Sequence, residues 1–189
     1  MRPLHHIGYW VGDLDAAVAR ATRDLGVGPF LVHRNVRFEE FRYADGRLVD
    51  DPDHLDHTAA FAAWGPVVLE FGQVHAIDPE LATAYGYPAG GSASSSSVAM
   101  EVGHVSWVVD DLAAESERLE VAGCRLIHTA ASGAVRVAWH DGGPLFPHPI
   151  EVHLAGPPIL GMHARLSALA NGWDGRDPLR PMTGPAPAT

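Results

Sequence analysis

A local pattern occurs twice in this chain, 98 positions apart, and this duplication constrains the possible fold more than any other feature. Residues 103–112 read GHVSWVVDDL, and residues 6–14 read HIGYWVGDL. When His6 is aligned with His104, matching positions continue as far as Arg20 and Arg118. The period is too long for a solenoid repeat, so the pattern predicts a duplicated module of strands and a helix.

Each module is predicted to contain a strand, a helix and then three strands. Side-chain alternation over residues 4–12 indicates a strand, Asp13 is a suitable helix N-cap, and Gly26 is a suitable C-cap. The predicted strands lie at 4–12, 30–33, 58–64 and 67–73 in the first module and at 102–109, 124–128, 135–140 and 149–154 in the second. The expected fold class is therefore α+β, with paired βαβββ modules whose half-covered sheets enclose a cleft.

This interpretation divides the chain into four segments. The first module covers residues 1–74, and the second covers 102–157. Between them, 75–101 is expected to be a flexible linker, because it contains the low-complexity Ser-rich run at 90–97. Residues 158–189 are expected to form a C-terminal helix followed by a loose, proline-rich tail.

Composition narrows the class of function. The formal charge of −10 and the pI near 5.5 argue against a nucleic-acid-binding surface, which needs clustered basic residues. The absence of a long apolar run and of a signal-peptide pattern favours a cytoplasmic protein with no membrane partner. Cys124 is the only cysteine, which excludes an intramolecular disulfide and disfavours a thiolate metal site. A small-molecule substrate is the expected partner.

The late strand of each module carries one glutamate among apolar residues. Glu70 lies in the run VVLEF, and Glu151 lies in the run PIEVHL. A buried carboxylate is costly unless it is paired or binds a metal. His6 and His104 occupy equivalent positions in the repeat, so the two modules together offer two imidazoles and two carboxylates. This donor set suits a divalent ion of Zn, Ni, Co, Mn or Fe.

Each of these four residues could also have an ordinary structural role that involves no metal. A single histidine near a strand start is usually solvated or hydrogen-bonded, and a strand glutamate often faces solvent or pairs with an arginine. Arg136 is available as a partner for Glu70 or Glu151. The metal site is favoured because both residue types recur at repeat-equivalent positions in both modules.

The remaining histidines are interpreted by their position along the strands. His5 and His6 face opposite sides of their strand, so only one of them is expected to point inward. His153 shares a face with Glu151 and is a candidate to orient a ligand. A role outside the site is expected for His33, His54, His57, His75, His128, His140 and His163.

Four protein ligands on an octahedral ion leave two positions for substrate oxygens. Such a centre can chelate a substrate with two neighbouring oxygens and stabilise an enediolate. Glu70 or Glu151 could then take a proton from the carbon next to a carbonyl and return it. Both glutamates are therefore candidate catalytic residues as well as candidate ligands.

The four motifs, taken in order, resemble the signature strands of the vicinal oxygen chelate superfamily. This group includes glyoxalase I, methylmalonyl-CoA epimerase, extradiol dioxygenases and bleomycin-resistance proteins. The resemblance covers residues 4–155 and implies a metal-centred cleft, often in a homodimer. The positions that it implies for metal ligands are His6, Glu70, His104 and Glu151, a set similar to that of glyoxalase I.

Two features of the chain depart from the best-matching branches. The Gly-His-Val opening of the second module is similar to the epimerases, but those enzymes usually carry glutamine at the position of Glu70. The separate catalytic glutamate of the epimerases has no clear counterpart, although Glu39 and Glu40 lie in the corresponding region. No arginine set typical of glutathione binding is present.

The leading hypothesis is a metal-dependent isomerase, epimerase or lyase that transfers a proton next to a carbonyl through an enediolate. A second hypothesis is an Fe(II) extradiol-type dioxygenase, for which His6, His104 and Glu151 would supply the facial triad. A third is a non-catalytic, resistance-type protein that binds a small molecule. The sequence leaves open the metal, the substrate, and whether the cleft forms within one chain or between two.

Overall fold

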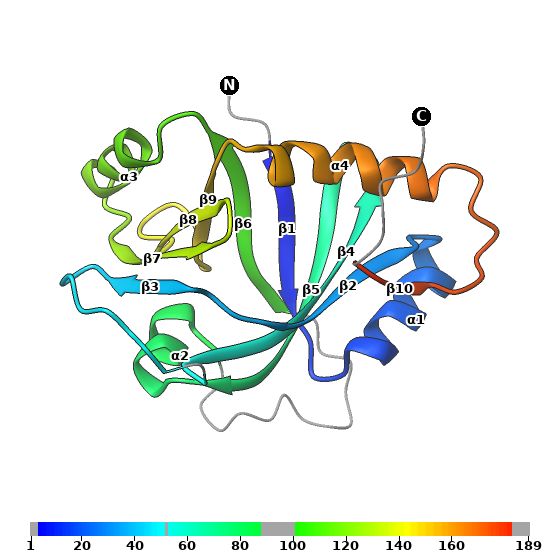
Figure 1. The fold of residues 1–189 in the computed structure, drawn as a ribbon, viewed down its shortest axis with the longest axis horizontal. Coiled ribbons are helices and arrows are strands. Elements are labelled where there is room, and N and C mark those ends of the chain that lie inside the picture. Colours follow the sequence, from blue (N-terminus) through cyan, green and yellow to red (C-terminus); the bar gives the residue numbers. More distant parts are fainter. Residues whose placement is uncertain (1–3, 52, 88–100, 183–189) are drawn as a thin grey trace.

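The computed structural model describes residues 4–51, 53–87 and 101–182. Within these ranges the chain forms ten strands and four helices, shown in Figure 1. In chain order they are β1 (Leu4–Trp10), α1 (Leu14–Leu25), β2 (Phe30–Val36), β3 (Glu40–Tyr43), β4 (Leu55–Trp64), β5 (Val67–Ile77), α2 (Pro79–Tyr85), β6 (Glu101–Val109), α3 (Leu112–Val121), β7 (Leu126–Ser132), β8 (Val135–His140), β9 (Ile150–Leu154), α4 (Pro157–Ala170) and β10 (Leu179–Pro181).

All ten strands belong to one sheet, in the order β10-β2-β4-β5-β1-β6-β9-β8-β7-β3. Within each module the first strand pairs in parallel with the last, β1 with β5 and β6 with β9. The two modules join edge to edge where β1 pairs antiparallel with β6. The expected α+β class with paired modules is therefore confirmed, and the first strand of each module lies at the centre of the sheet.

The two module helices start with the same cap, as the repeat predicts. The Asp13 side chain accepts a hydrogen bond from the Ala16 amide, and the Asp111 side chain accepts one from the Ala114 amide. Each cap satisfies an amide that has no partner within its helix. The helix α1 ends at Gly26, whose φ of 66° is a left-handed conformation that favours glycine.

Side-chain alternation on β5 separates the two faces of the sheet. Leu69 and Phe71 pack with α1 in one apolar cluster, whereas Val68 packs with Leu166 of α4 on the opposite face. Glu70 shares the face of Val68, because side chains two residues apart in a strand point the same way. The glutamate is therefore on the face that α4 partly covers, away from α1.

Two strands extend the sheet beyond the predicted modules. Strand β3 leaves the first module and pairs antiparallel with β7 of the second, and β10 pairs in parallel with β2 at the other edge. No strand was predicted at 40–43, and the region of β10 was predicted to be loose tail. Both segments are short edge strands held by distant partners, and local periodicity contains no information about such pairing.

The segment predicted as a linker is partly ordered. Strand β5 continues to Ile77, and α2 follows it with Asp78 as its N-cap. The Ser-rich run at 90–97 lies outside the described residues, as does the end of the predicted tail at 183–189. Among the helices described, none combines the length and the apolar character needed to cross a membrane.

Candidate metal centre

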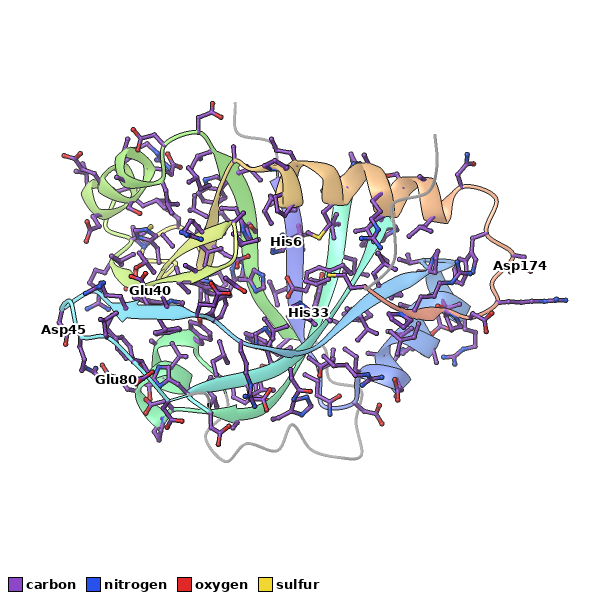
Figure 2. The ribbon with its side chains drawn as sticks, in the orientation of Figure 1. His6, His33, Glu40, Asp45, Glu80 and Asp174 are labelled. Atoms are coloured by element: carbon purple, nitrogen blue, oxygen red, sulfur yellow. The ribbon has the colours of Figure 1, made fainter. Side chains whose placement is uncertain are left out.

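The four candidate ligands lie on the four central strands of the sheet. His6 is on β1, Glu70 on β5, His104 on β6 and Glu151 on β9. Figure 2 shows His6 near the middle of the molecule. All four side chains come from one chain, with one histidine and one glutamate from each module, so this cluster forms within a single chain.

Strand register brings the four side chains to one place. Gly8 is the pairing partner of both Glu70 on β5 and His104 on β6. Ser106 has the equivalent position in the second module and pairs with the other two candidate ligands, His6 and Glu151. Each small residue is therefore flanked by a histidine and a glutamate on neighbouring strands, and the pseudo-symmetry of the modules produces one cluster.

The donor atoms are close enough to share one ion. The Nε2 atom of His6 lies 3.2 Å from Glu70 Oε2 and 2.9 Å from Glu151 Oε2. The Nε2 atom of His104 lies 3.2 and 3.5 Å from the same two oxygens, and the two Nε2 atoms are 3.0 Å apart. Ligands about 2.1 Å from an ion are about 3.0 Å apart at right angles and about 3.4 Å apart in a tetrahedron. The donor separations therefore fit a transition-metal ion.

Because the four side chains are buried, the negative charge of the two glutamates is energetically costly unless a positive charge lies beside it. The exposed fractions are 2% for His6, 3% for His104, 8% for Glu70 and 7% for Glu151. Two carboxylates so close together and so little exposed repel each other unless positive charge lies between them. One possible ligand atom from each of the four residues lies within 4.8 Å of the ligand atoms of the other three, as expected of a metal site.

The protonation of the cluster reflects the same need for positive charge. Burial opposes protonation of His6, but hydrogen bonds to Glu151 and Glu70 outweigh it and raise the pKa of His6 to about 9. Burial alone would raise the pKa of Glu70, but hydrogen bonds from His104 and His6 hold that pKa well below its ordinary value. His153 and His6 likewise hold the pKa of Glu151 well below its ordinary value, against the effect of burial. Both glutamates are therefore anionic and available as ligands at neutral pH.

His5 contacts the ring of His6, although the two were predicted to face opposite sides of their strand. Its Nδ1 atom is 2.8 Å from His6 Nδ1, and its Nε2 atom is 3.4 Å from the carbonyl oxygen of Ile159. A register shift in the β1–β6 pairing between Leu4 and His6 accompanies this contact. Strict alternation predicts opposite faces for the two histidines, so the irregularity accounts for the difference.

These contacts assign the tautomer of His6. Burial and the nearby His6 and His153 lower the pKa of His5 to about 4, so its ring is neutral at pH 7. The carbonyl of Ile159 can only accept a hydrogen bond, so His5 Nε2–H donates to it and His5 Nδ1 is left as an acceptor. His6 Nδ1–H then donates to His5, so the proton that a bound cation would replace is the one on Nε2, and the Nε2 lone pair would then be directed to the cluster.

Replacement of His5 by phenylalanine should therefore weaken metal binding about 10- to 100-fold, the usual cost of losing a residue that orients a ligand. His5→Asn, whose amide oxygen can accept from His6 Nδ1–H, should retain more of the affinity. The measurement is competition with a chromophoric Zn²⁺ chelator. Equal affinities for wild type and His5→Phe would show that His5 does not orient His6.

The other residues singled out from the sequence take different positions. His153 is buried beside the cluster, with its Nε2 atom 2.9 Å from Glu151 Oε2. Arg136 pairs with neither glutamate and donates instead to the carbonyl oxygens of Gly133 and Val135. The ion-pair explanation for the two strand glutamates therefore does not hold.

A cavity of about 230 Å³ opens next to the cluster. Three of the four candidate ligands line it, and the fourth, His104, contacts them without lining the cavity. Two histidines that were expected to have a role outside the site also line it, the buried His57 and the exposed His33. His57 shares a strand face with Ala59 and Phe61, because side chains two and four residues apart in a strand point the same way. All three line the cavity, so strand alternation is the sequence signal that could have placed His57 there.

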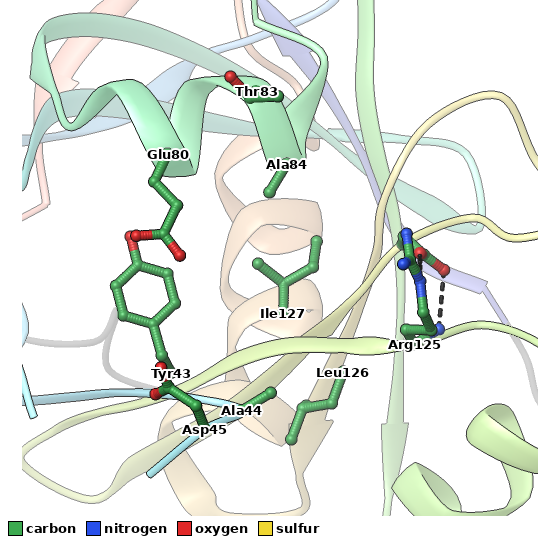
Figure 3. Close-up of a pocket in the computed structure, with 10 residues that line it drawn as sticks. Tyr43, Ala44, Asp45, Glu80, Thr83, Ala84, Arg125, Leu126 and Ile127 are labelled. Atoms are coloured by element: carbon green, nitrogen blue, oxygen red, sulfur yellow. Dashed lines mark hydrogen bonds and ion pairs between the residues drawn. The ribbon is translucent and has the colours of Figure 1, made fainter. Parts of the chain in front are cut away.

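A larger hollow of about 460 Å³ lies elsewhere, between α2 and β7, and is shown in Figure 3. None of the four candidate ligands lines it. Its charged side chains pair with neighbouring groups, Arg125 with Asp141 at 2.8 Å and Glu80 with Arg47 at 2.7 Å. We therefore assign the chemistry to the smaller cavity, because the four converging donors meet only there among the described residues.

The geometry defines a class of protein, a pair of βαβββ modules with a histidine–glutamate cluster at their junction. A family model described as glyoxalase/bleomycin resistance protein/dioxygenase superfamily matches residues 5–139. The chain belongs to this superfamily, which confirms the resemblance seen in the sequence motifs. No curated protein sequence matches the chain.

Solved structures are similar to this chain at low sequence identity. A hypothetical protein from Bacillus halodurans is 14% identical, with 82% of this chain and 96% of that chain covered and a TM-score of 0.51. Methylmalonyl-CoA epimerase from Mycobacterium tuberculosis is 18% identical, with 84% and 91% covered and a TM-score of 0.48. A variant of the Streptomyces coelicolor epimerase, in complex with 2-nitronate-propionyl-CoA, is 15% identical, with 82% and 96% covered and a TM-score of 0.49.

Proposed function

We propose that this protein is a metal-dependent isomerase, epimerase or lyase that moves a proton on the carbon next to a carbonyl group. One observation carries the proposal: two imidazoles and two carboxylates from different modules converge, almost fully buried, at the end of a small cavity. The family of the chain supports a small-molecule reaction. The donor set suits Zn, Ni, Co, Mn or Fe(II).

In the proposed site the metal ligands are His6, Glu70, His104 and Glu151. A divalent cation held by them would polarise the substrate oxygens and so increase the acidity of the adjacent C–H bond. Other residues of the chain position these ligands. His5 orients His6, and Gly8, which pairs with His104 across the strands and has no side chain, leaves space for the ring of His104.

The two glutamates are the proposed proton acceptors. Both line the cavity, so a carboxylate oxygen of either can reach a substrate carbon held there. The walls around them are mainly apolar, with Phe61 and Val137 among them, and they limit the access of water to the exchanging proton. Return of a proton to the opposite face of the same carbon gives epimerisation, and return of a proton to a neighbouring carbon gives isomerisation.

Deuterium wash-in tests this proposal. The metal-loaded protein is incubated in heavy water with a panel of 2-oxo acids, hydroxyketones and acyl thioesters, and α-deuterium is measured by mass spectrometry. We expect exchange with at least one compound. Either Glu70→Gln or Glu151→Gln should lower the exchange rate about 100- to 10,000-fold, because an amide cannot accept the proton. No exchange with any compound, while the ion is bound, would contradict the proposal.

A second candidate is an Fe(II) ring-cleaving oxygenase. It is favoured by the meeting of His6, His104 and Glu151 in one place and by the aromatic side chains of Phe38 and Phe61 in the cavity wall. The fourth donor, Glu70, is not required for such a facial triad. An oxygen electrode separates the two candidates, since only the oxygenase consumes oxygen when catechols are added.

A further inference from the structure

The cavity next to the cluster has a wall that comes from outside the two repeated modules. Ile159 and Met162 of α4 line it, and so does Met182, which follows β10. The opposite walls come from the modules themselves. The apolar residues around the cavity are Val36, Phe38, Ala59, Phe61, Val135, Val137, Pro158, Ile159, Met162 and Met182.

The added wall is held in place by packing and hydrogen bonds. Leu166 of α4 is fully buried in a cluster with Leu31 and Val68, and Met162 packs against the same cluster. The Met182 amide donates to the Val32 carbonyl at 2.9 Å, and Arg165 Nη2 donates to the Met182 carbonyl at 3.0 Å. Figure 1 shows α4 alongside the sheet next to β4 and β5. These contacts fix the position of the added wall relative to the cluster.

The size of the cavity limits its occupant. Its volume of about 230 Å³ is below the roughly 300–1,000 Å³ of pockets that enclose drug-sized ligands. It can hold a chelating head and one ring or branched alkyl group. A nucleotide-sized group would have to lie outside it.

The charge of the cavity limits the occupant further. No arginine is among the described residues that line it, and the chain has no lysine. Its anionic groups, Glu70 and Glu151, and His6, which pairs with both of them, belong to the cluster, and burial lowers the pKa of His57 to about 4, so that ring is neutral at pH 7. A phosphate or carboxylate on the body of a ligand would be desolvated without a partner, which is strongly unfavourable.

We propose that the site selects a small chelating substrate, with two neighbouring oxygens on an aryl or branched-alkyl body, through the apolar walls formed by Phe61 of β4 and by the added residues Met162 and Met182. This inference rests on the proposed function, because the wall acts on a substrate whose oxygens meet the cluster. It excludes a substrate whose binding depends on a long polyanionic group inside the cavity. Met162 is the proposed specificity-determining residue.

Hydroxamates test the inference because they share one chelating head and differ in the body. Acetohydroxamate and benzohydroxamate are titrated into the Co²⁺-loaded protein, and the visible cobalt spectrum gives each dissociation constant. We expect benzohydroxamate to bind about 30-fold more tightly, since the ring buries roughly 80 Å² more apolar surface at about 25 cal/mol per Å². Acetyl-CoA should not displace it.

Variants of α4 locate the selectivity. Met162→Glu should reduce the preference for benzohydroxamate to less than about fivefold, and Met162→Ala should also reduce it, by less. Leu160→Glu is the matched control, because Leu160 lies on the same helix with 61% of its surface exposed and should leave the preference unchanged.

The possible failures are distinguishable. Equal binding of the two hydroxamates, or displacement of benzohydroxamate by acetyl-CoA, would overturn the apolar wall while leaving the chelating centre intact. A cobalt spectrum that neither hydroxamate changes would overturn the proposed function itself. An unchanged preference in Met162→Glu would overturn the role of this residue.

Discussion

His104→Ala should lower the affinity for a divalent cation by more than about a hundredfold and abolish α-proton exchange. The loss should exceed the roughly 10- to 100-fold cost of removing a residue that only orients a ligand. His104 Nε2 lies 3.2 and 3.5 Å from the carboxylates of Glu70 and Glu151, so its removal leaves His6 as the one imidazole in the cluster. Calorimetric titration with Zn²⁺ or Co²⁺ measures the change.

Thermal unfolding gives an independent readout of the same variant. A cation at 100 times its dissociation constant stabilises the folded state by about 2.7 kcal/mol, so it should raise the melting temperature of the wild type. The His104→Ala protein should show little of this shift. His75→Ala is the matched control, because His75 is an exposed histidine on the strand of Glu70 and lies outside the cluster. A wild-type shift in both variants would argue against ligation by His104.

Gly8→Ala should weaken cation binding about 10- to 100-fold, although glycine offers no ligand. A Cβ atom at Gly8 would overlap the imidazole ring of His104. The backbone of β1 cannot move away readily, because β5 and β6 pair with it on both sides. The ring of His104 must therefore shift from its position, and overpacking should also cost about 1–3 kcal/mol of stability. Titration and denaturant unfolding measure the two effects.

Gly161→Ala provides the contrast. Gly161 lies in α4, and an added Cβ would meet no atom within 4 Å. This variant should keep the wild-type affinity and gain about 0.5–1 kcal/mol of stability, because alanine favours a helix interior over glycine. If Gly8→Ala binds the cation as tightly as Gly161→Ala does, the space left by Gly8 has no role in the site.

The repeat was sufficient to predict the fold class and the convergence of the four candidate ligands. Equivalent residues in two modules occupy equivalent strand positions, so one histidine and one glutamate from each module meet when β1 pairs with β6. Strand β5 includes the strand predicted at 67–73, and its alternation places Leu69 and Phe71 on the face away from Glu70.

The remaining features depend on irregular or long-range contacts. His5 reaches His6 where the β1–β6 register shifts, and no local pattern predicts such a shift. The pairing of β3 with β7 and of β10 with β2 joins segments far apart in the sequence. The cavity wall at Met162 and Met182 depends on how α4 packs, and the composition of that helix does not specify its partner.

Anomalous diffraction from crystals of the Co²⁺-loaded protein would show whether the four side chains bind one cation. We predict a single strong peak about 2.0–2.2 Å from His6 Nε2, His104 Nε2 and one carboxylate oxygen each of Glu70 and Glu151. A cobalt ion found only at other residues of the protein, with these four side chains free of it, would show that they are not the metal ligands.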